Sequence, residues 1–128
     1  MTKVVHFEVP YEEAKRAKDF YQKVFGWKIN DVPMKDVEYQ MINTGPTGED
    51  GMVKEKGFIN GGLTPRNEMA KGPVIVMGVE DIHEKLKEVE ESGGKTVMDP
   101  VPVGEMGFYA YFKDTEDNVI GIWQDKKK

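Results

Sequence analysis

The chain has 128 residues, of which 38% are hydrophobic and 32% charged, and this is enough for one compact domain with a real core. Its net charge of −5 and the lack of a basic stripe argue against nucleic acid as a partner. No run approaches the roughly 20 apolar residues of a membrane-spanning helix, and there is no cysteine for a disulfide, a thiolate ligand or a nucleophile. We therefore expect a soluble, cytoplasmic protein without a membrane partner.

The segment from residue 4 to residue 29 predicts a strand, a helix and the start of a second strand. In the first strand apolar side chains alternate with ionisable ones: Val5, Phe7 and Val9 against His6 and Glu8. A period of two places the apolar set on one sheet face and the ionisable pair on the other. Pro10 is expected to end strand pairing.

A helix is expected to start at Glu12 and Glu13, where acidic side chains favour the positive end of the helix, and to end at Gly26 in a left-handed conformation. Its apolar residues recur at helical spacing and are expected to pack against the sheet: Ala14, Ala17, Phe20 or Tyr21, Val24 and Phe25. Strands are then expected over residues 27–32, 37–43 and 58–63. Tyr39 and Met41 share a face of the second of these, together with Val37. The adjacent Gly61 and Gly62 indicate a bulge or a close approach of backbone or ligand.

The second half of the chain repeats the first in kind. A strand is expected over residues 73–79, then a helix capped by Asp81 with an apolar stripe of Ile82, Leu86 and Val89, ending at Gly93 and Gly94. Strands follow over residues 95–101, 108–113 and 119–124. Alternation places Tyr109 and Tyr111 on one face of the penultimate strand, and Trp123 on one face of the last strand with Val119 and Gly121.

Four stretches, in order and at matched spacing, resemble the vicinal oxygen chelate superfamily of glyoxalase I, bleomycin-resistance proteins and extradiol dioxygenases: VVHFEV, FYQKVFGW, VIVMGVEDIHEKLKEVEESGGKTV and FKDTEDNVIGIWQ. The resemblance implies an α+β fold in which two βαβββ modules form a cup-shaped mixed sheet. The repeated pattern, with a linker that contains Pro65 and ends before Pro73, places module one at residues 1–64, the linker at 64–73, module two at 73–125 and a basic tail at 126–128. The resemblance also favours a homodimer.

Members of this superfamily often hold a divalent metal through one residue from each of four strands. The resemblance puts these positions at His6, at Gly61 or Gly62, at Val74 and at Gly121, and of these only His6 can coordinate through its side chain. Glu8 could join it, but catalytic metal sites normally supply about three protein ligands. We expect no tightly bound metal and no other cofactor, and we expect His83 to be a solvated surface residue.

His6 and Glu8 are the candidate catalytic and ligand-binding residues. His6 could be a buried histidine bonded to Glu8 or to a neighbouring strand, or a group that binds or deprotonates a ligand. The aromatic residues that could line a small-molecule site, or serve packing or a dimer interface, are Tyr39, Tyr109, Tyr111 and Trp123.

Three functions are compatible with these features. The first is a metal-free protein that binds a small organic molecule in the cup. The second is a metal-dependent lyase, isomerase or dioxygenase of the glyoxalase type. The third is a non-catalytic structural or regulatory module whose cup is filled by its own side chains. Whether the protein is an enzyme stays open from the sequence.

Overall fold

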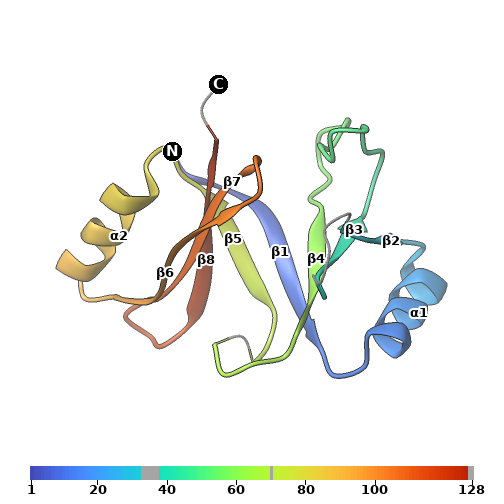
Figure 1. Ribbon diagram of the computed structural model, residues 1–128, viewed down its shortest axis with the longest axis horizontal. Coiled ribbons are helices and arrows are strands. Elements are labelled where there is room, and N and C mark those ends of the chain that lie inside the picture. Colours follow the sequence, from blue (N-terminus) through green and yellow to red (C-terminus); the bar gives the residue numbers. More distant parts are fainter. Residues whose placement is uncertain (33–37, 70, 127–128) are drawn as a thin grey trace. The chain divides into compact units, whose positions relative to one another are not determined.

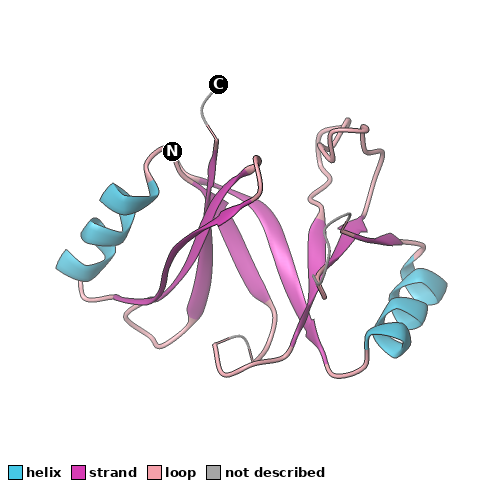
Figure 2. Ribbon diagram, in the orientation of Figure 1, coloured by secondary structure: helices cyan, strands magenta, loops and turns pink. Residues whose placement is uncertain are grey.

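The computed structural model describes residues 1–32, 38–69 and 71–126, and the contacts within the chain divide it into two units. We call His6–Pro73 the first module, and Met1–Val5 together with Val74–Lys128 the second module. Figures 1 and 2 show that each contains one helix beside a group of strands. The repeat of strand, helix and three strands that the sequence predicts is therefore present in both halves of the chain.

The first module contains the part of β1 (Lys3–Tyr11) from His6 onward, α1 (Ala14–Phe25), β2 (Lys28–Asp31), β3 (Gln40–Asn43) and β4 (Gly61–Pro65). Its strands lie in the order β2-β3-β4-β1, with β1 parallel to β4 and the other neighbours antiparallel. Ile29, Ile42 and Leu63 form its buried centre. Partly buried side chains of β1, α1 and Trp27 pack around that centre: Phe7, Val9, Tyr11, Ala17, Tyr21 and Trp27. The predicted apolar face of the first strand is thus the core face.

The end of β1 and the position of β4 differ from those expected. Pro10 does not end β1, because pairing with β4 continues through Pro10 and Tyr11, and the Tyr11 carbonyl accepts a hydrogen bond of 2.9 Å from the Arg66 N–H. A proline removes one donor from a ladder, and that loss is tolerated near a strand end. The fourth strand lies at Gly61–Pro65, a few residues later than expected. The pairing with β1 therefore sets the position of β4 in the sequence.

The expected apolar stripe of α1 is only partly correct. Ala17 and Tyr21 pack against the core, but Phe20, Val24 and Phe25 keep 53%, 55% and 58% of their surface exposed. A helix on a short sheet buries one stripe, and residues a third of a turn away from it stay in solvent. Gly26 does adopt the predicted left-handed conformation, with φ 71°, and its N–H donates to the Gln22 carbonyl.

The second module contains β5 (Val74–Gly78), α2 (Ile82–Glu91), β6 (Lys95–Val103), β7 (Gly107–Lys113) and β8 (Val119–Asp125), in the sheet order β5-β8-β7-β6. β5 runs parallel to β8, and the other neighbouring pairs are antiparallel. Its core consists of two residues of α2 and three of the sheet: Ile82, Leu86, Ala110, Phe112 and Ile122. The Asp81 side chain accepts a hydrogen bond of 3.1 Å from the Glu84 N–H, which confirms the predicted cap.

Within the described residues, no helix combines the length and the apolar character needed to cross a lipid bilayer.

Candidate functional site

The face of β1 that points away from the core of the first module carries two ionisable residues. Phe7 and Val9 belong to the core, so the strand alternation places His6 and Glu8 on the opposite face. Glu8 is only 6% exposed, and His6 is partly buried. A buried carboxyl group is costly unless it is hydrogen-bonded or paired, and Glu8 does have interaction partners in the structure. The packing of the core does not require His6 and Glu8 on this face, so the face is the best-defined candidate for a functional site.

His6 is bonded to Tyr39, a residue 33 positions later in the chain. The His6 Nε2 atom lies 2.6 Å from the Tyr39 hydroxyl oxygen, and the two rings are nearly parallel, with an interplanar angle of 17°. Burial lowers the pKa of His6 from 6.5 to about 4. The imidazole is therefore neutral at pH 7, and its tautomer decides which partner donates to the other. The sequence left Glu8 or a neighbouring strand open as the partner of His6, but Tyr39 directly precedes β3, which β4 separates from β1.

Gly62 provides the space in which the Tyr39 ring lies. Gly62 pairs with Glu8 on β1 and with Met41 on β3. A Cβ atom at position 62 would lie 2.0 Å from both the Cζ and the hydroxyl oxygen of Tyr39. Because such contacts are sterically impossible, residue 62 must be glycine as long as Tyr39 keeps this position.

Gly61 and Gly62 were expected to mark either a bulge or a close approach of backbone or ligand, and the structure shows a close approach. The pairing of β4 with β1 and with β3 is regular at Gly61 and Gly62, so there is no bulge. The close approach is made by protein atoms: the ring and carbonyl of Phe7 at Gly61, and the ring of Tyr39 at Gly62. The pair of glycines therefore admits one aromatic side chain on each face of the strand.

The segment just before β3 holds Tyr39 in place. The Tyr11 hydroxyl donates a hydrogen bond of 2.6 Å to the Glu38 carbonyl, so the residue before Tyr39 is anchored to the end of β1. On the other side, Gln40 starts the pairing with β2 and donates 2.7 Å from Nε2 to Asp31. Val37, which the sequence places on the same face as Tyr39, lies outside the described residues.

The other predicted ligand-binding aromatics lie on one face of the second-module sheet. Tyr109 pairs with Trp123 and Tyr111 pairs with Gly121, and the two tyrosine rings make an edge contact with centroids 5.8 Å apart. Tyr111 is 5% exposed, and the Trp123 indole N–H donates 2.6 Å to Asp125. These residues pack together as a group, and their role in ligand binding stays a prediction.

The residues at the metal positions implied by the resemblance do not fit a divalent metal. Gly62 and Gly121 have no side-chain donor, and Val74 is an apolar core residue that is 2% exposed. No cluster of three or more His, Cys, Asp or Glu side chains that could hold a metal occurs in the described part of the chain. His83 is exposed on α2, as expected, and is not near such a group.

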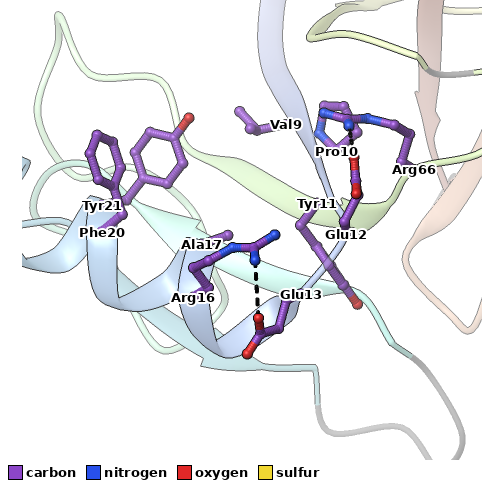
Figure 3. A pocket seen from close by; sticks show the side chains of 10 residues that line it. All are labelled: Val9, Pro10, Tyr11, Glu12, Glu13, Arg16, Ala17, Phe20, Tyr21 and Arg66. Carbon is purple, nitrogen blue, oxygen red and sulfur yellow. Dashed lines mark hydrogen bonds and ion pairs between the residues drawn. The ribbon is translucent and has the colours of Figure 1, made fainter.

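A separate pocket of about 340 Å³ lies in the first module between the end of β1 and the start of α1 (Figure 3). Phe20 and Tyr21 line one side, and two ion pairs line the other: Glu12 with Arg66, and Glu13 with Arg16. The sequence analysis did not identify this group, because Arg66 joins it only through the register of β4 on β1. All four charged side chains are exposed and form ion pairs with each other, and exposed ion pairs of this kind contribute little to stability.

Comparisons with known proteins agree with this architecture. The family model described as "Glyoxalase/Bleomycin resistance protein/Dioxygenase superfamily" matches residues 3–122. A "Glyoxylase-like domain-containing protein" from Didymella fabae is 26% identical over 117 residues, which cover 90% of this chain and 88% of that protein.

Solved structures show the same fold at low sequence identity. A hypothetical protein from Bacillus halodurans C-125 has a TM-score of 0.66 at 21% identity, covering 99% of this chain and 96% of its own. Methylmalonyl-CoA epimerase from Mycobacterium tuberculosis has a TM-score of 0.67 at 12% identity, covering 97% of this chain and 88% of the enzyme. A Streptomyces coelicolor methylmalonyl-CoA epimerase variant in complex with 2-nitronate-propionyl-CoA reaches 0.70 at 15% identity, covering 99% of both chains.

Proposed function

The chain belongs to the glyoxalase/bleomycin resistance protein/dioxygenase superfamily, and on this basis we propose that it binds a small organic molecule without a tightly bound metal. The binding surface that we propose is the sheet face of the first module with His6, Glu8 and Tyr39. We further propose that the protein works as a homodimer in the cytoplasm, as its family resemblance and composition suggest.

One observation carries this proposal. Two ionisable side chains occupy the strand face opposite the core, and both are withdrawn from water. Folding alone favours apolar residues at such positions, because removing an ionisable group from water has a cost that an apolar residue does not have. A ligand that forms hydrogen bonds with these groups gives a reason for their presence.

The chemistry of the face favours recognition by hydrogen bonds and ring contacts. Tyr39 contributes a phenol whose hydroxyl can bond to His6 and to a further partner at the same time. Aromatic walls with a few polar groups are typical of sites for small organic molecules. The face of the second-module sheet with Tyr109, Tyr111 and Trp123 is an aromatic surface of its own, and we propose these three residues as ligand contacts of that module.

A second candidate function is proton transfer by a metal-independent enzyme. The Nε2 atom of His6 and the hydroxyl of Tyr39, 2.6 Å apart, share a proton that the phenol can exchange with a bound substrate, whereas the lowered pKa of His6 makes the imidazole itself a weak base at pH 7. The likeness to methylmalonyl-CoA epimerases is a likeness of fold, but it makes acyl-CoA esters a sensible first class of compounds to test.

Native mass spectrometry of freshly purified protein, with elemental analysis of the same sample, tests the proposed function. We expect a metal-free dimer that carries an organic mass or acquires one from a panel of aromatic compounds and acyl-CoA esters. His6→Ala and Glu8→Gln should weaken this binding at least tenfold, or about 1.4 kcal/mol. His83→Ala, which changes the exposed histidine of α2, is the matched control and should bind as the wild type does.

Three results would contradict the proposal. A stoichiometric divalent metal would favour the glyoxalase-type enzyme. If His6→Ala and Glu8→Gln leave the binding unchanged, the ligand does not bind to this face of the first module. Failure to bind any compound of the panel would favour a structural or regulatory module. If a ligand is bound, its conversion to product would distinguish the proton-transfer enzyme from a simple binding protein.

A further inference from the structure

We infer that the Tyr39 ring occupies the space that a metal-coordinating side chain at position 62 would need. This sheet face therefore takes a neutral organic ligand through hydrogen bonds to the Tyr39–His6 pair. The inference deepens the proposed function and rests on it for the organic ligand. Its steric part, the mutual exclusion of Tyr39 and a side chain at position 62, stands on geometry alone.

The space above Gly62 on β4 is occupied by the Tyr39 ring. A side chain at residue 62 would point onto the same face as Glu8, its pairing partner. Its Cβ atom would lie 2.0 Å from the Tyr39 hydroxyl oxygen, whereas real Cβ atoms essentially never come within 3.0 Å of a non-bonded heavy atom. A coordinating residue at position 62 therefore forces the Tyr39 ring out of its present position.

The second step concerns the imidazole. The Nε2 atom of His6 is engaged at 2.6 Å by the Tyr39 hydroxyl. In one tautomer Nε2 accepts the phenol proton and its lone pair is used, and in the other it carries a hydrogen and has no lone pair. Under either assignment this nitrogen cannot bind a cation until Tyr39 leaves. Tyr39 thus occupies the space for a metal ligand at position 62, and it also engages the Nε2 atom through which His6 would bind a metal.

The third step concerns the ligand that remains possible. A phenol hydroxyl can donate one hydrogen bond and accept others, so an oxygen-bearing ligand can bond to the Tyr39 hydroxyl beside, or in exchange for, its partners within the protein. The pair can therefore present either a donor or an acceptor without a change in charge. This matches a neutral compound with a carbonyl or hydroxyl oxygen beside an apolar or aromatic group, since charged groups are poorly accommodated where water is excluded.

The inference is tested with Co²⁺ alone as the probe, because its absorption spectrum reports coordination. We expect the wild type and Tyr39→Phe, which keeps the ring but loses the hydroxyl, to show no stoichiometric Co²⁺ spectrum. Gly62→Glu combined with Tyr39→Ala restores a carboxylate beside Glu8 and frees His6. This double variant should bind one Co²⁺ at least tenfold more tightly than the wild type, and His6→Ala should abolish the binding.

Stoichiometric Co²⁺ binding by the wild type that is lost in His6→Ala would overturn the inference. So would a folded double variant that binds Co²⁺ no better than the wild type. Binding that is lost in His83→Ala and kept in His6→Ala is a surface effect and agrees with the inference.

If the double variant does not fold, a measurement of stability still tests the steric part. In the wild type, Gly62→Ala forces the Tyr39 ring away, but in a Tyr39→Ala background the space is free. We expect Gly62→Ala to reduce the folding equilibrium constant at least tenfold more in the first background than in the second. Equal effects would overturn the steric part. The native mass spectrum tests the organic ligand separately, so loss of the proposed function and loss of this inference can be told apart.

Discussion

The two modules share one arrangement of strands but differ in what they place on the face opposite the helix. The first strand of the first module, β1, presents His6 and Glu8 there, whereas β5 of the second module presents Val74 and Val76, which are 2% and 6% exposed. The fold does not require polar groups on this face, because the second module forms without them. The difference teaches that His6 and Glu8 are specific to one module, and it is the reason for placing the proposed ligand there.

The last strands of the modules, β4 and β8, show the same contrast through their glycines. Gly62 on β4 lies under the Tyr39 phenol, while Gly121 on β8 lies under Val76 and the Tyr111 ring. A Cβ atom would come within 2.0 Å of Tyr39 but only within 3.0 Å of Val76. Each space is filled by side chains of its own module, polar in the first and apolar or aromatic in the second.

The largest expected effects come from the two cores. Ile42 in the first module and Ile122 in the second are both fully buried. Each mutation to alanine should lower the free energy of unfolding by about 2–5 kcal/mol, since it removes buried methyl groups and leaves a cavity. Chemical denaturation with circular dichroism measures the loss. Similar losses would show equally tight cores, and a loss below about 1 kcal/mol at either site would contradict the packing described.

The second prediction concerns pH and uses the contrast between His6 and the exposed His83. Since the pKa of His6 falls from 6.5 in the unfolded chain to about 4 in the folded one, protons bind the unfolded chain preferentially. The stability held by the neutral ring is complete above pH 6.5 and is lost as the pH falls toward 4. Between pH 7 and pH 4 this amounts to about 3 kcal/mol at most.

The matching measurement is denaturation of wild type, His6→Ala and His83→Ala across this pH range, because carboxyl groups common to all three cancel in the differences. The stability gap between wild type and His6→Ala should narrow as the pH falls, and His83→Ala is the control for the removal of an exposed imidazole. A His6 ring that titrates near 6.5 by NMR would contradict the burial of this residue.

The smallest effects compare glycines of β4 and β8. Gly61→Ala should destabilise the first module by about 1–3 kcal/mol, because its Cβ would lie 2.6 Å from the Phe7 carbonyl oxygen, and backbone cannot move as cheaply as a side chain. Gly121→Ala should cost less than about 1 kcal/mol, since Val76 has to shift by only a few tenths of an ångström. Thermal unfolding of both variants tests the order, and a larger loss at Gly121 would reverse it.

Much of the fold follows from local patterns in the sequence. The alternation of Val5, Phe7 and Val9 with His6 and Glu8 correctly predicts the two faces of β1. The cap at Asp81 and the left-handed Gly26 are likewise local, because each depends on backbone geometry and on residues within one helical turn. Helix and strand types were therefore predictable, and so was the family, whose signature lies in the order of these elements.

The partners that define the candidate site were not predictable in the same way. Tyr39 was a candidate on aromatic character alone, and nothing in the sequence paired it with His6 or placed its ring over Gly62. Val24 and Phe25 of α1 were expected in the core but are exposed, because helical spacing shows a stripe but not how much of it the sheet covers.

The sequence by itself thus determined the order of the elements, the face of each strand and the poverty of metal-binding side chains, since these depend on residue type and short spacing. Only the tertiary structure decided that His6 is neutral and bonded to a phenol, and that Gly62 is bare because Tyr39 covers it. These facts arise from strand register, which brings together residues distant in the chain at a separation that no local pattern encodes.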